Sequence, residues 1–74
     1  MELYFNRKSL SHYKVYDDSI TVYLVGGDSF TVNFNFSSDK MSCEKMLRSM
    51  LNLSCGYSGI AWYDSAAGKI YFGR

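Results

Sequence analysis

The single histidine and the hydroxyl groups near it are the first residues whose types could do chemistry. His12 stands close to Ser9 and Ser11, and a histidine that takes a proton from a serine hydroxyl is the basis of one common form of nucleophilic catalysis. Such a set also needs an acidic side chain that orients the imidazole. The nearest acids, Asp17 and Asp18, fall in a predicted tight turn. We therefore predict no catalytic residues and a protein that is not an enzyme.

Residues that could bind a metal or a cofactor form no recognisable set either. Adjacent aspartates in a tight turn diverge, so Asp17 and Asp18 predict turn chemistry and not a metal site. Cys43 and Cys55 lie twelve residues apart without a CxxC motif or a neighbouring histidine. This spacing fits neither zinc nor a redox pair and predicts two reduced thiols. Because no GxGxxG or GxxxxGK[ST] motif occurs, we predict no metal and no cofactor.

Length and composition predict one domain over residues 1–74. The chain of 74 residues is 47% hydrophobic, 18% aromatic and 20% charged, which is typical of a globular protein whose surface is rich in Ser, Asn, Thr and Tyr. A net charge of +1 provides no large field to attract nucleic acid or an acidic membrane. The N-terminal residues resemble neither a secretory signal nor a membrane span, so we expect a soluble cytoplasmic protein without a membrane partner.

The elements that must position these side chains are mostly strands. Period-two alternation runs through HYKVYD, ITVYLV and FTVNFNF, and the breakers DDS and GGD separate these runs into a three-stranded meander. A three-residue loop in the second hairpin, closed as a type I turn and bulge by Gly27 in the left-handed region, keeps the apolar residues on one face. In the first hairpin, we predict that Val15 lies opposite Ile20 and Tyr13 opposite Val22. In the second hairpin, the inward-facing residues Ile20, Val22 and Leu24 are predicted to align with Phe30, Val32 and Phe34.

Two further segments predict strands at the ends of the chain. ELYFN places Leu3 and Phe5 on one side and Tyr4 on the other, as a possible edge strand that pairs with either the meander or the last hairpin. GIAWYDSAAGKIYFG predicts a final hairpin whose turn, Ala66-Ala67-Gly68, has its glycine in the left-handed position. The residues expected to point inward in this hairpin are Ile60, Trp62, Ile70 and Phe72.

Helical spacing replaces the strand pattern between residues 39 and 53. Apolar residues recur at i, i+3, i+4, i+7 and i+8, while lysine, glutamate and arginine take the other side, which predicts one amphipathic helix. Ser38 or Asp39 can cap its start and Gly56 can end it. The residues of the apolar stripe are Cys43, Met46, Leu47, Met50 and Leu51.

The sequence thus predicts an α+β protein of the form βββ(β)-α-ββ. We expect an antiparallel sheet of four to six short strands, with the amphipathic helix packed on its apolar face.

The opposite, uncharged face of that sheet is the predicted binding surface. Tyrosine offers a large amphipathic contact area at a small entropy cost, and uncharged neighbours avoid the desolvation penalty of buried Lys or Glu. Acidic residues at the loop tips adjoin this face. The predicted contact residues are Tyr16, Tyr23, Thr31, Asn33, Asn35, Tyr63 and Tyr71, with Asp17, Asp18, Asp28 and Asp64 in the loops.

Three functions fit such a surface. The first is a non-enzymatic module that binds a protein or a ribonucleoprotein. The second is a single-stranded nucleic-acid binder, because exposed sheet tyrosines beside Lys14 and Lys69 can stack bases. The third is a homodimeric structural domain in which the sheet face is its own interface.

A compositional resemblance supports the first function. A 74-residue α+β chain rich in Ser, Asn and Tyr, without a catalytic set, resembles the small phage-encoded inhibitors of host defence, the anti-CRISPR proteins among them. The resemblance implies a protein that acts in the host cytoplasm by blocking a large host protein or ribonucleoprotein. It covers composition and size only and carries over no functional residue.

Overall fold

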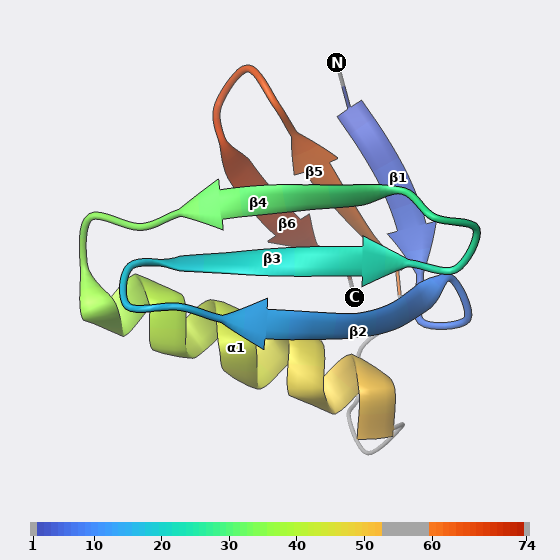
Figure 1. Cartoon of the computed structure of the whole chain (residues 1–74), viewed down its shortest axis with the longest axis horizontal. Helices are drawn as coiled ribbons and strands as arrows, with labels where there is room; N and C mark the ends of the chain where they lie inside the picture. Colours follow the sequence, from blue (N-terminus) through green and yellow to red (C-terminus); the bar gives the residue numbers. More distant parts are fainter. Residues whose placement is uncertain (1, 53–59, 74) are drawn as a thin grey trace.

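A computed structural model describes residues 2–52 and 60–73 of the chain. Six strands and one helix follow one another in the order four strands, helix, two strands, which confirms the predicted α+β class (Figure 1). The elements are β1 (Glu2–Asn6), β2 (Leu10–Val15), β3 (Ser19–Leu24), β4 (Ser29–Asn33), α1 (Ser37–Asn52), β5 (Ile60–Asp64) and β6 (Lys69–Phe72).

The strands divide into two antiparallel sheets of three, with the orders β2-β3-β4 and β1-β5-β6. The sequence left the partner of β1 open, and the structure pairs it with β5. The chain passes from one sheet to the other at a corner after β1. There the Asn6 side-chain oxygen accepts hydrogen bonds from the backbone N–H groups of Lys8 and Ser9, at 2.9 and 3.1 Å. This asparagine turn explains why β2 starts a second sheet and does not continue the first.

The predicted registers of the meander are confirmed. Tyr13 lies opposite Val22 in the first hairpin, and Ile20 and Val22 lie opposite Val32 and Phe30 in the second. Because side chains alternate strictly along a strand, these registers place the apolar residues of all three strands on one face.

The loop between β3 and β4 has the predicted three residues but a different turn. The Leu24 N–H donates to the Asp28 carbonyl at 2.8 Å, and the Gly27 N–H donates to the Leu24 carbonyl at 3.2 Å. Gly26 and Gly27 have φ angles of 104° and 103°. A type I turn requires negative φ at the position of Gly26, so the predicted type I turn is wrong, whereas the left-handed conformation of Gly27 is confirmed.

A bulge in β2 was not predicted. The register with β3 shifts between Leu10 and His12, so Ser11 is an extra residue without its own partner. The shift keeps buried Leu10 and partly buried Tyr13 on the same side, although three positions separate them. Without the bulge, one of these two side chains would face solvent.

Helix α1 begins two residues earlier than predicted. The Lys40 N–H donates to the Phe36 carbonyl at 3.3 Å, which makes Phe36 the capping position and rules out Ser38 and Asp39 in that role. Asp39 instead lies in the first turn, where a negative charge stabilises the helix dipole. The predicted end of the helix at Gly56 falls outside the described residues.

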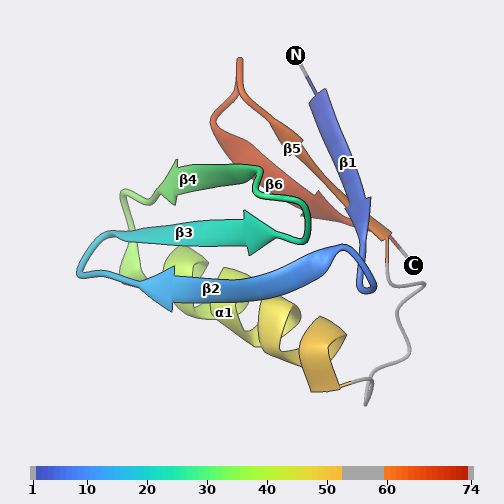
Figure 2. The same cartoon turned by 45° about the vertical axis from the view of Figure 1, so that its right-hand side comes forward.

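The core forms where the helix and the second sheet lie side by side on one face of the β2-β3-β4 sheet (Figures 1 and 2). The helix contacts β2 and β3. Its buried residues are Cys43, Leu47 and Met50, and Met46 is partly buried. Leu51, which was predicted to point inward, is 38% exposed because it lies at the rim of the stripe. The buried residues are Phe5, Leu10, Ile20, Val22, Leu24, Phe30, Val32, Cys43, Leu47, Met50 and Ala61.

Lys40 ties the start of the helix to the first hairpin. Its ammonium group donates to the carbonyl oxygens of Tyr16 and Asp17, both at 2.8 Å. The carbonyl groups of this turn thus accept hydrogen bonds from a charged side chain of the helix. These two charge-assisted hydrogen bonds fix the position of the helix over the meander.

Replacing Leu47 by alanine should strongly destabilise the protein, because this side chain is fully buried between helix and sheet. We expect a loss of about 2–5 kcal/mol in the free energy of unfolding, measured by urea denaturation. Leu51→Ala, in the same helix but at the exposed rim, is the matched control and should cost about 0.5 kcal/mol. Equal losses in the two variants would contradict the orientation of the helix.

The buried thiol of Cys43 should resist alkylation. Burial raises its pKa from the ordinary 9.0 to about 12, and the thiolate is the reactive form. In a Cys55→Ser variant at pH 9, we expect iodoacetamide to react at least roughly 100-fold more slowly with the folded protein than with the urea-unfolded chain. Because the folded pKa is raised, the stability contributed by the neutral thiol is complete below pH 9 and decreases as the pH rises towards 12. Equal rates would place Cys43 at the surface.

Candidate functional site

The outer face of the β2-β3-β4 sheet carries part of the predicted contact set. The ring of Tyr23 stacks on His12 with centroids 4.5 Å apart and planes 10° apart, and the Lys14 ammonium lies 5.5 Å from the same ring centroid. The Thr21 and Thr31 hydroxyl groups are hydrogen-bonded across the strands at 2.9 Å. These polar and aromatic groups therefore interact mainly with one another along the sheet.

His12 also contacts the bulged serine. The Ser11 hydroxyl and the His12 Nδ1 atom are 2.9 Å apart on exposed surface. The imidazole is held by this hydrogen bond and by its stacking on Tyr23. Among the described residues, no group of three or more His, Cys, Asp or Glu side chains comes together that could hold a metal ion.

The predicted loop acids have different environments. Asp17, Asp18 and Asp28 are exposed in the two turns of the meander. Asp64 is partly buried, and its carboxylate accepts hydrogen bonds from the Ala66 and Ala67 N–H groups at 3.0 and 3.3 Å. Asp64 thus stabilises the turn between β5 and β6, which leaves less of its carboxylate for a partner.

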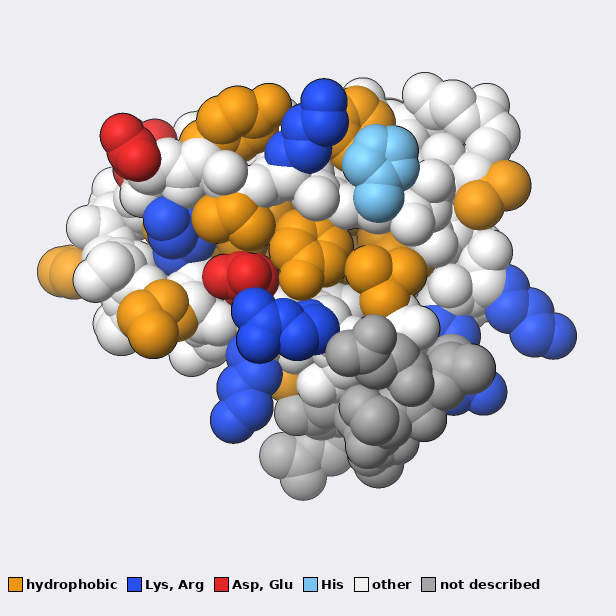
Figure 3. All heavy atoms as spheres, turned by 60° about the horizontal axis from the view of Figure 1, so that its bottom comes forward, with side chains coloured by type: hydrophobic (Ala, Val, Ile, Leu, Met, Phe, Trp, Pro, Cys, Tyr) orange, Lys and Arg blue, Asp and Glu red, His pale blue; other side chains and the backbone are white. Residues whose placement is uncertain are grey.

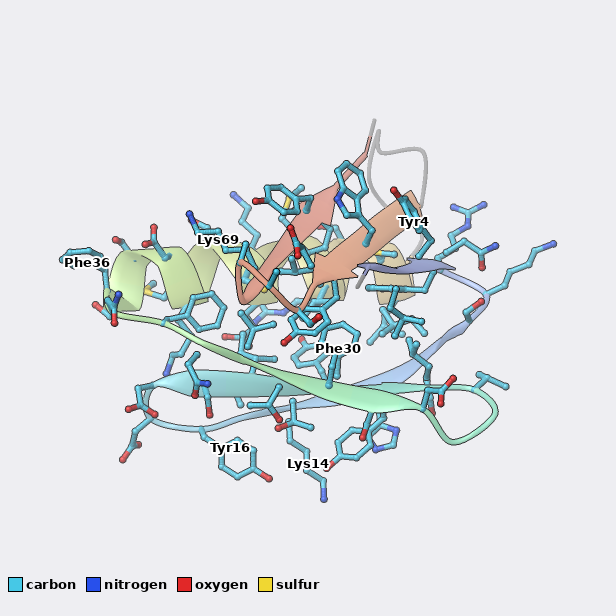
Figure 4. All side chains as sticks on the ribbon, turned by 90° about the horizontal axis from the view of Figure 1, so that it is seen from above. Tyr4, Lys14, Tyr16, Phe30, Phe36 and Lys69 are labelled. Carbon is cyan, nitrogen blue, oxygen red and sulfur yellow. The ribbon has the colours of Figure 1, made fainter. Side chains whose placement is uncertain are left out.

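Tyr63 and Tyr71, predicted to extend the same face, lie elsewhere. The ring of Tyr63 stacks on Phe30 at the core, with centroids 4.3 Å and planes 11° apart. Tyr71 is 39% exposed, but it belongs to the other sheet. Lys14 and Tyr16 point to one side of the molecule and Tyr4 to the opposite side (Figure 4). The predicted contact residues therefore do not form one surface.

A loop that is one residue longer than predicted explains this difference. Asp64 pairs with Lys69, and the Gly68 N–H donates to the Asp64 carbonyl at 2.8 Å, so the loop has four residues and not three. The extra residue moves the side chains of Ala61, Trp62 and Tyr63 to the face opposite to the predicted one. Ala61 and Tyr63 consequently face the core, and Trp62, which was predicted to point inward, faces outward. The left-handed conformation of Gly68 is confirmed by its φ of 66°.

The reversed register creates a row of three aromatic rings across the β1-β5-β6 sheet. Tyr4 lies opposite Trp62, and Trp62 lies opposite Tyr71. The ring centroids are 5.9 Å and 5.4 Å apart, with planes tilted by 26° and 19°. Tyr4 is 63% exposed and Trp62 is half-buried between its neighbours. We call Tyr4, Trp62 and Tyr71 the aromatic row.

The aromatic row was missed from the sequence because the loop length decides it. The signal that could have revealed it is Asp64, since an aspartate before two small residues favours the side-chain hydrogen bonds that open a four-residue loop. Once that loop is assumed, Tyr71 opposite Trp62 follows from the register. The pairing of Tyr4 with Trp62 joins two segments that are far apart in the sequence.

A groove opens on another side, between β4, the start of α1 and β6. It encloses about 510 Å³ and has a mainly apolar lining that includes Phe34, Met46 and Ile70, with Asn33 and Asn35 among its polar residues. Phe36 is 67% exposed beside it. The groove is half-open, and both of its strands, β4 and β6, are edge strands of their sheets.

Figure 3 shows the helix side of the molecule, where neighbouring apolar side chains form a short run across the face. Apolar side chains lie between Lys, Arg, Asp and Glu side chains on this face (Figure 3). Arg48 bonds Glu44 at 2.8 Å, and hydrogen bonds to Tyr13 and Glu44 raise the pKa of this arginine. Within the described part of the chain, no helix has the length and apolar character needed to span a membrane.

Comparison with protein-family models, with curated proteins and with solved structures gave no match to this chain. The functional assignment therefore depends on the geometry of its surfaces.

The outward position of Trp62 can be tested by its fluorescence, since it is the only tryptophan of the chain. We expect acrylamide to quench Trp62 in the folded protein. Replacing both Tyr4 and Tyr71 by serine should increase the quenching constant by a factor of about two, because both flanking rings are removed. Tyr23→Ser, on the other sheet, should leave it unchanged. A folded protein whose tryptophan is fully protected would place Trp62 in the core.

Proposed function

We propose that this protein is a non-enzymatic protein-binding module whose contact surface is the aromatic row on the β1-β5-β6 sheet. The observation that carries this proposal is the exposure of Tyr4 and Tyr71 on either side of Trp62, in one row across three paired strands. Large aromatic side chains at the surface are the residues most enriched at the energetic centres of protein interfaces.

The order of the row favours binding. Each ring is held by its neighbour and by a paired strand, so little side-chain entropy remains to be lost when a partner docks. Asp64 and Lys69, which have opposite charges, lie opposite each other at the end of the β5-β6 pair. At the aromatic row itself, a partner therefore meets aromatic rings with hydroxyl and indole N–H groups.

The same geometry disfavours the alternative of single-stranded nucleic acid. A base inserted between two rings needs a plane separation of about 6.8 Å, twice the 3.4 Å stacking rise. The separation of two planes cannot exceed the distance between their centroids, which is 5.9 Å and 5.4 Å in the row. On the other sheet, Tyr23 is already stacked on His12. Neither surface therefore offers the series of open ring faces that stacked bases require.

Blocking a host protein or ribonucleoprotein is the mode of action we favour within this function. Support comes from the resemblance of the chain in size and composition to small phage-encoded inhibitors of host defence. A rigid surface on a small domain acts sterically when it covers a site on a larger protein. Such a module needs no catalytic group of its own.

The test is capture of a partner with variants of each sheet. The wild-type protein, Tyr71→Thr and Tyr23→Thr are immobilised and exposed to lysate of the native or host cell, with and without nuclease. We expect a defined protein retained in near-stoichiometric amount after nuclease treatment. Tyr71→Thr should reduce retention by about tenfold or more, because truncating an aromatic side chain that contributes strongly to an interface commonly costs about 2 kcal/mol. Tyr23→Thr, an equivalent truncation on the other sheet, should retain the partner.

Three results would contradict the proposal. Retention that disappears with nuclease would indicate nucleic acid. Retention that depends on Tyr23 and not on Tyr71 would move the site to the β2-β3-β4 sheet. The absence of any retained protein would leave self-association as the better explanation. Urea denaturation of each variant confirms that a loss of retention is not a loss of folding.

A further inference from the structure

We propose that the groove between β4, α1 and β6 binds a single-chain aliphatic carboxylate, with the tail on the groove floor and the carboxylate at Lys69. The groove has a volume of about 510 Å³, which lies within the range of roughly 300–1,000 Å³ that is typical of small-molecule sites. The aromatic row does not line this groove. The proposal therefore goes beyond the function proposed above and does not depend on it.

The floor of the groove is apolar and continuous with the core. Val32 and Cys43, two of its lining residues, belong to the buried core and are 2% and 6% exposed. Each methylene group of an aliphatic chain gains free energy when it leaves water for such a surface. A flexible chain also fits an irregular floor, to which a methionine side chain can adapt. The partly buried residues of the lining are Phe34, Met46, Ile70 and Phe72.

The shape of the groove favours an amphipathic molecule over a wholly apolar one. Its walls come from the end of β4, the first half of α1 and the start of β6, and it is half-open. A bound molecule therefore keeps one side in water, where a polar end remains hydrated. Figure 4 shows Lys69 and Phe36, both of which line the groove, on the same side of the molecule, near the beginning of α1.

The rim of the groove is rich in hydrogen-bond donors. A carboxylate group accepts hydrogen bonds and donates none, so it suits a rim of ammonium, amide and hydroxyl groups. Among the described residues of the lining, Asp39 is the one carboxylate that opposes it. The donor residues of the rim are Asn33, Asn35, Ser42 and Lys69.

The charges at the rim select a carboxylate over an ammonium group. Among the described residues, Lys69 forms no ion pair. Its cross-strand neighbour Asp64 uses its carboxylate to accept the N–H groups of Ala66 and Ala67. Asp39 lies in the first turn of α1, where the helix dipole offsets part of its negative charge. The charge that remains for a ligand is therefore the positive charge of Lys69.

Titration of the full chain with decanoate, followed by NMR, tests the proposal. We expect saturable binding with a Kd of about 0.1–1 mM, as befits a ligand of this size. Affinity should rise about threefold for each methylene added between octanoate and dodecanoate. The side-chain amide signals of Asn33 and Asn35 should shift, whereas that of Asn6, which does not line the groove, should not.

The role of the charge is tested with a ligand of opposite sign and with two lysine variants. Decylammonium, which has the same tail, should bind at least about fivefold more weakly than decanoate. Lys69→Gln should weaken decanoate binding by about fivefold, the usual effect of an exposed ion pair. Lys45→Gln is the matched control, because this exposed lysine of α1 lies outside the groove, and it should bind decanoate like the wild type. Both lysines are exposed, so both variants should fold.

Three outcomes would overturn the proposal. One is the absence of saturable binding up to about 10 mM decanoate. Another is decylammonium binding as tight as that of decanoate, or an equal effect of the two lysine variants, since the carboxylate would then not be at Lys69. The third is binding that shifts Asn6 and not Asn33 or Asn35, or that Tyr71→Thr abolishes, which would place the tail on another surface. None of these outcomes would decide the capture experiment, because the aromatic row does not line the groove.

Discussion

The stacking of Phe30 against the second sheet is the interaction on which the rest of the structure depends. Phe30 belongs to β4, yet its ring lies 4.3 Å from that of Tyr63 in β5 and 5.7 Å from that of Phe5 in β1. The main contacts of the helix with the meander are with β2 and β3. Phe30 and its two aromatic neighbours therefore supply a large part of the contact between the two sheets, together with the contact of β4 with β6. A domain of this size has no second core that could compensate for the loss of this contact.

Much of the fold follows from local patterns, which explains why it could be predicted. The meander, its three-residue loop and the pairing of Ile20 with Val32 are determined by alternation within about twenty consecutive residues. The helix follows from its spacing, with an error of two residues at its start, because the first turn carries polar residues that suit either a cap or a helix. The division into two sheets was not predictable in this way. It depends on the corner at Asn6 and on the pairing of β1 with β5, which are separated by most of the chain.

The candidate site was predicted less well than the fold, for a related reason. Exposed tyrosines were correctly expected, but the sequence does not state which sheet a tyrosine belongs to. Tyr23 and Tyr71 occupy different sheets, and Tyr63 faces the core. Trp62 was assigned to the wrong face because tryptophan is usually buried and because a three-residue turn was assumed. The residue types were enough to predict that the protein has an aromatic surface. The position of that surface could not be predicted, because it depends on the pairing of strands that are far apart in the sequence.

The four-residue loop between β5 and β6 has a consequence for how this chain can change during evolution. Surface loops ordinarily tolerate insertions and deletions, since their length affects little beyond the loop itself. Here the loss of one residue would exchange the two faces of β5, so that the indole of Trp62 would compete for the space now filled by Ala61 and Tyr63. We therefore expect a change of one residue in the length of this loop to disrupt the structure as strongly as a change in the core. We expect this loop to vary by substitution, or by insertion of two residues at a time. Such insertions keep each side chain of β5 on its present face of the sheet.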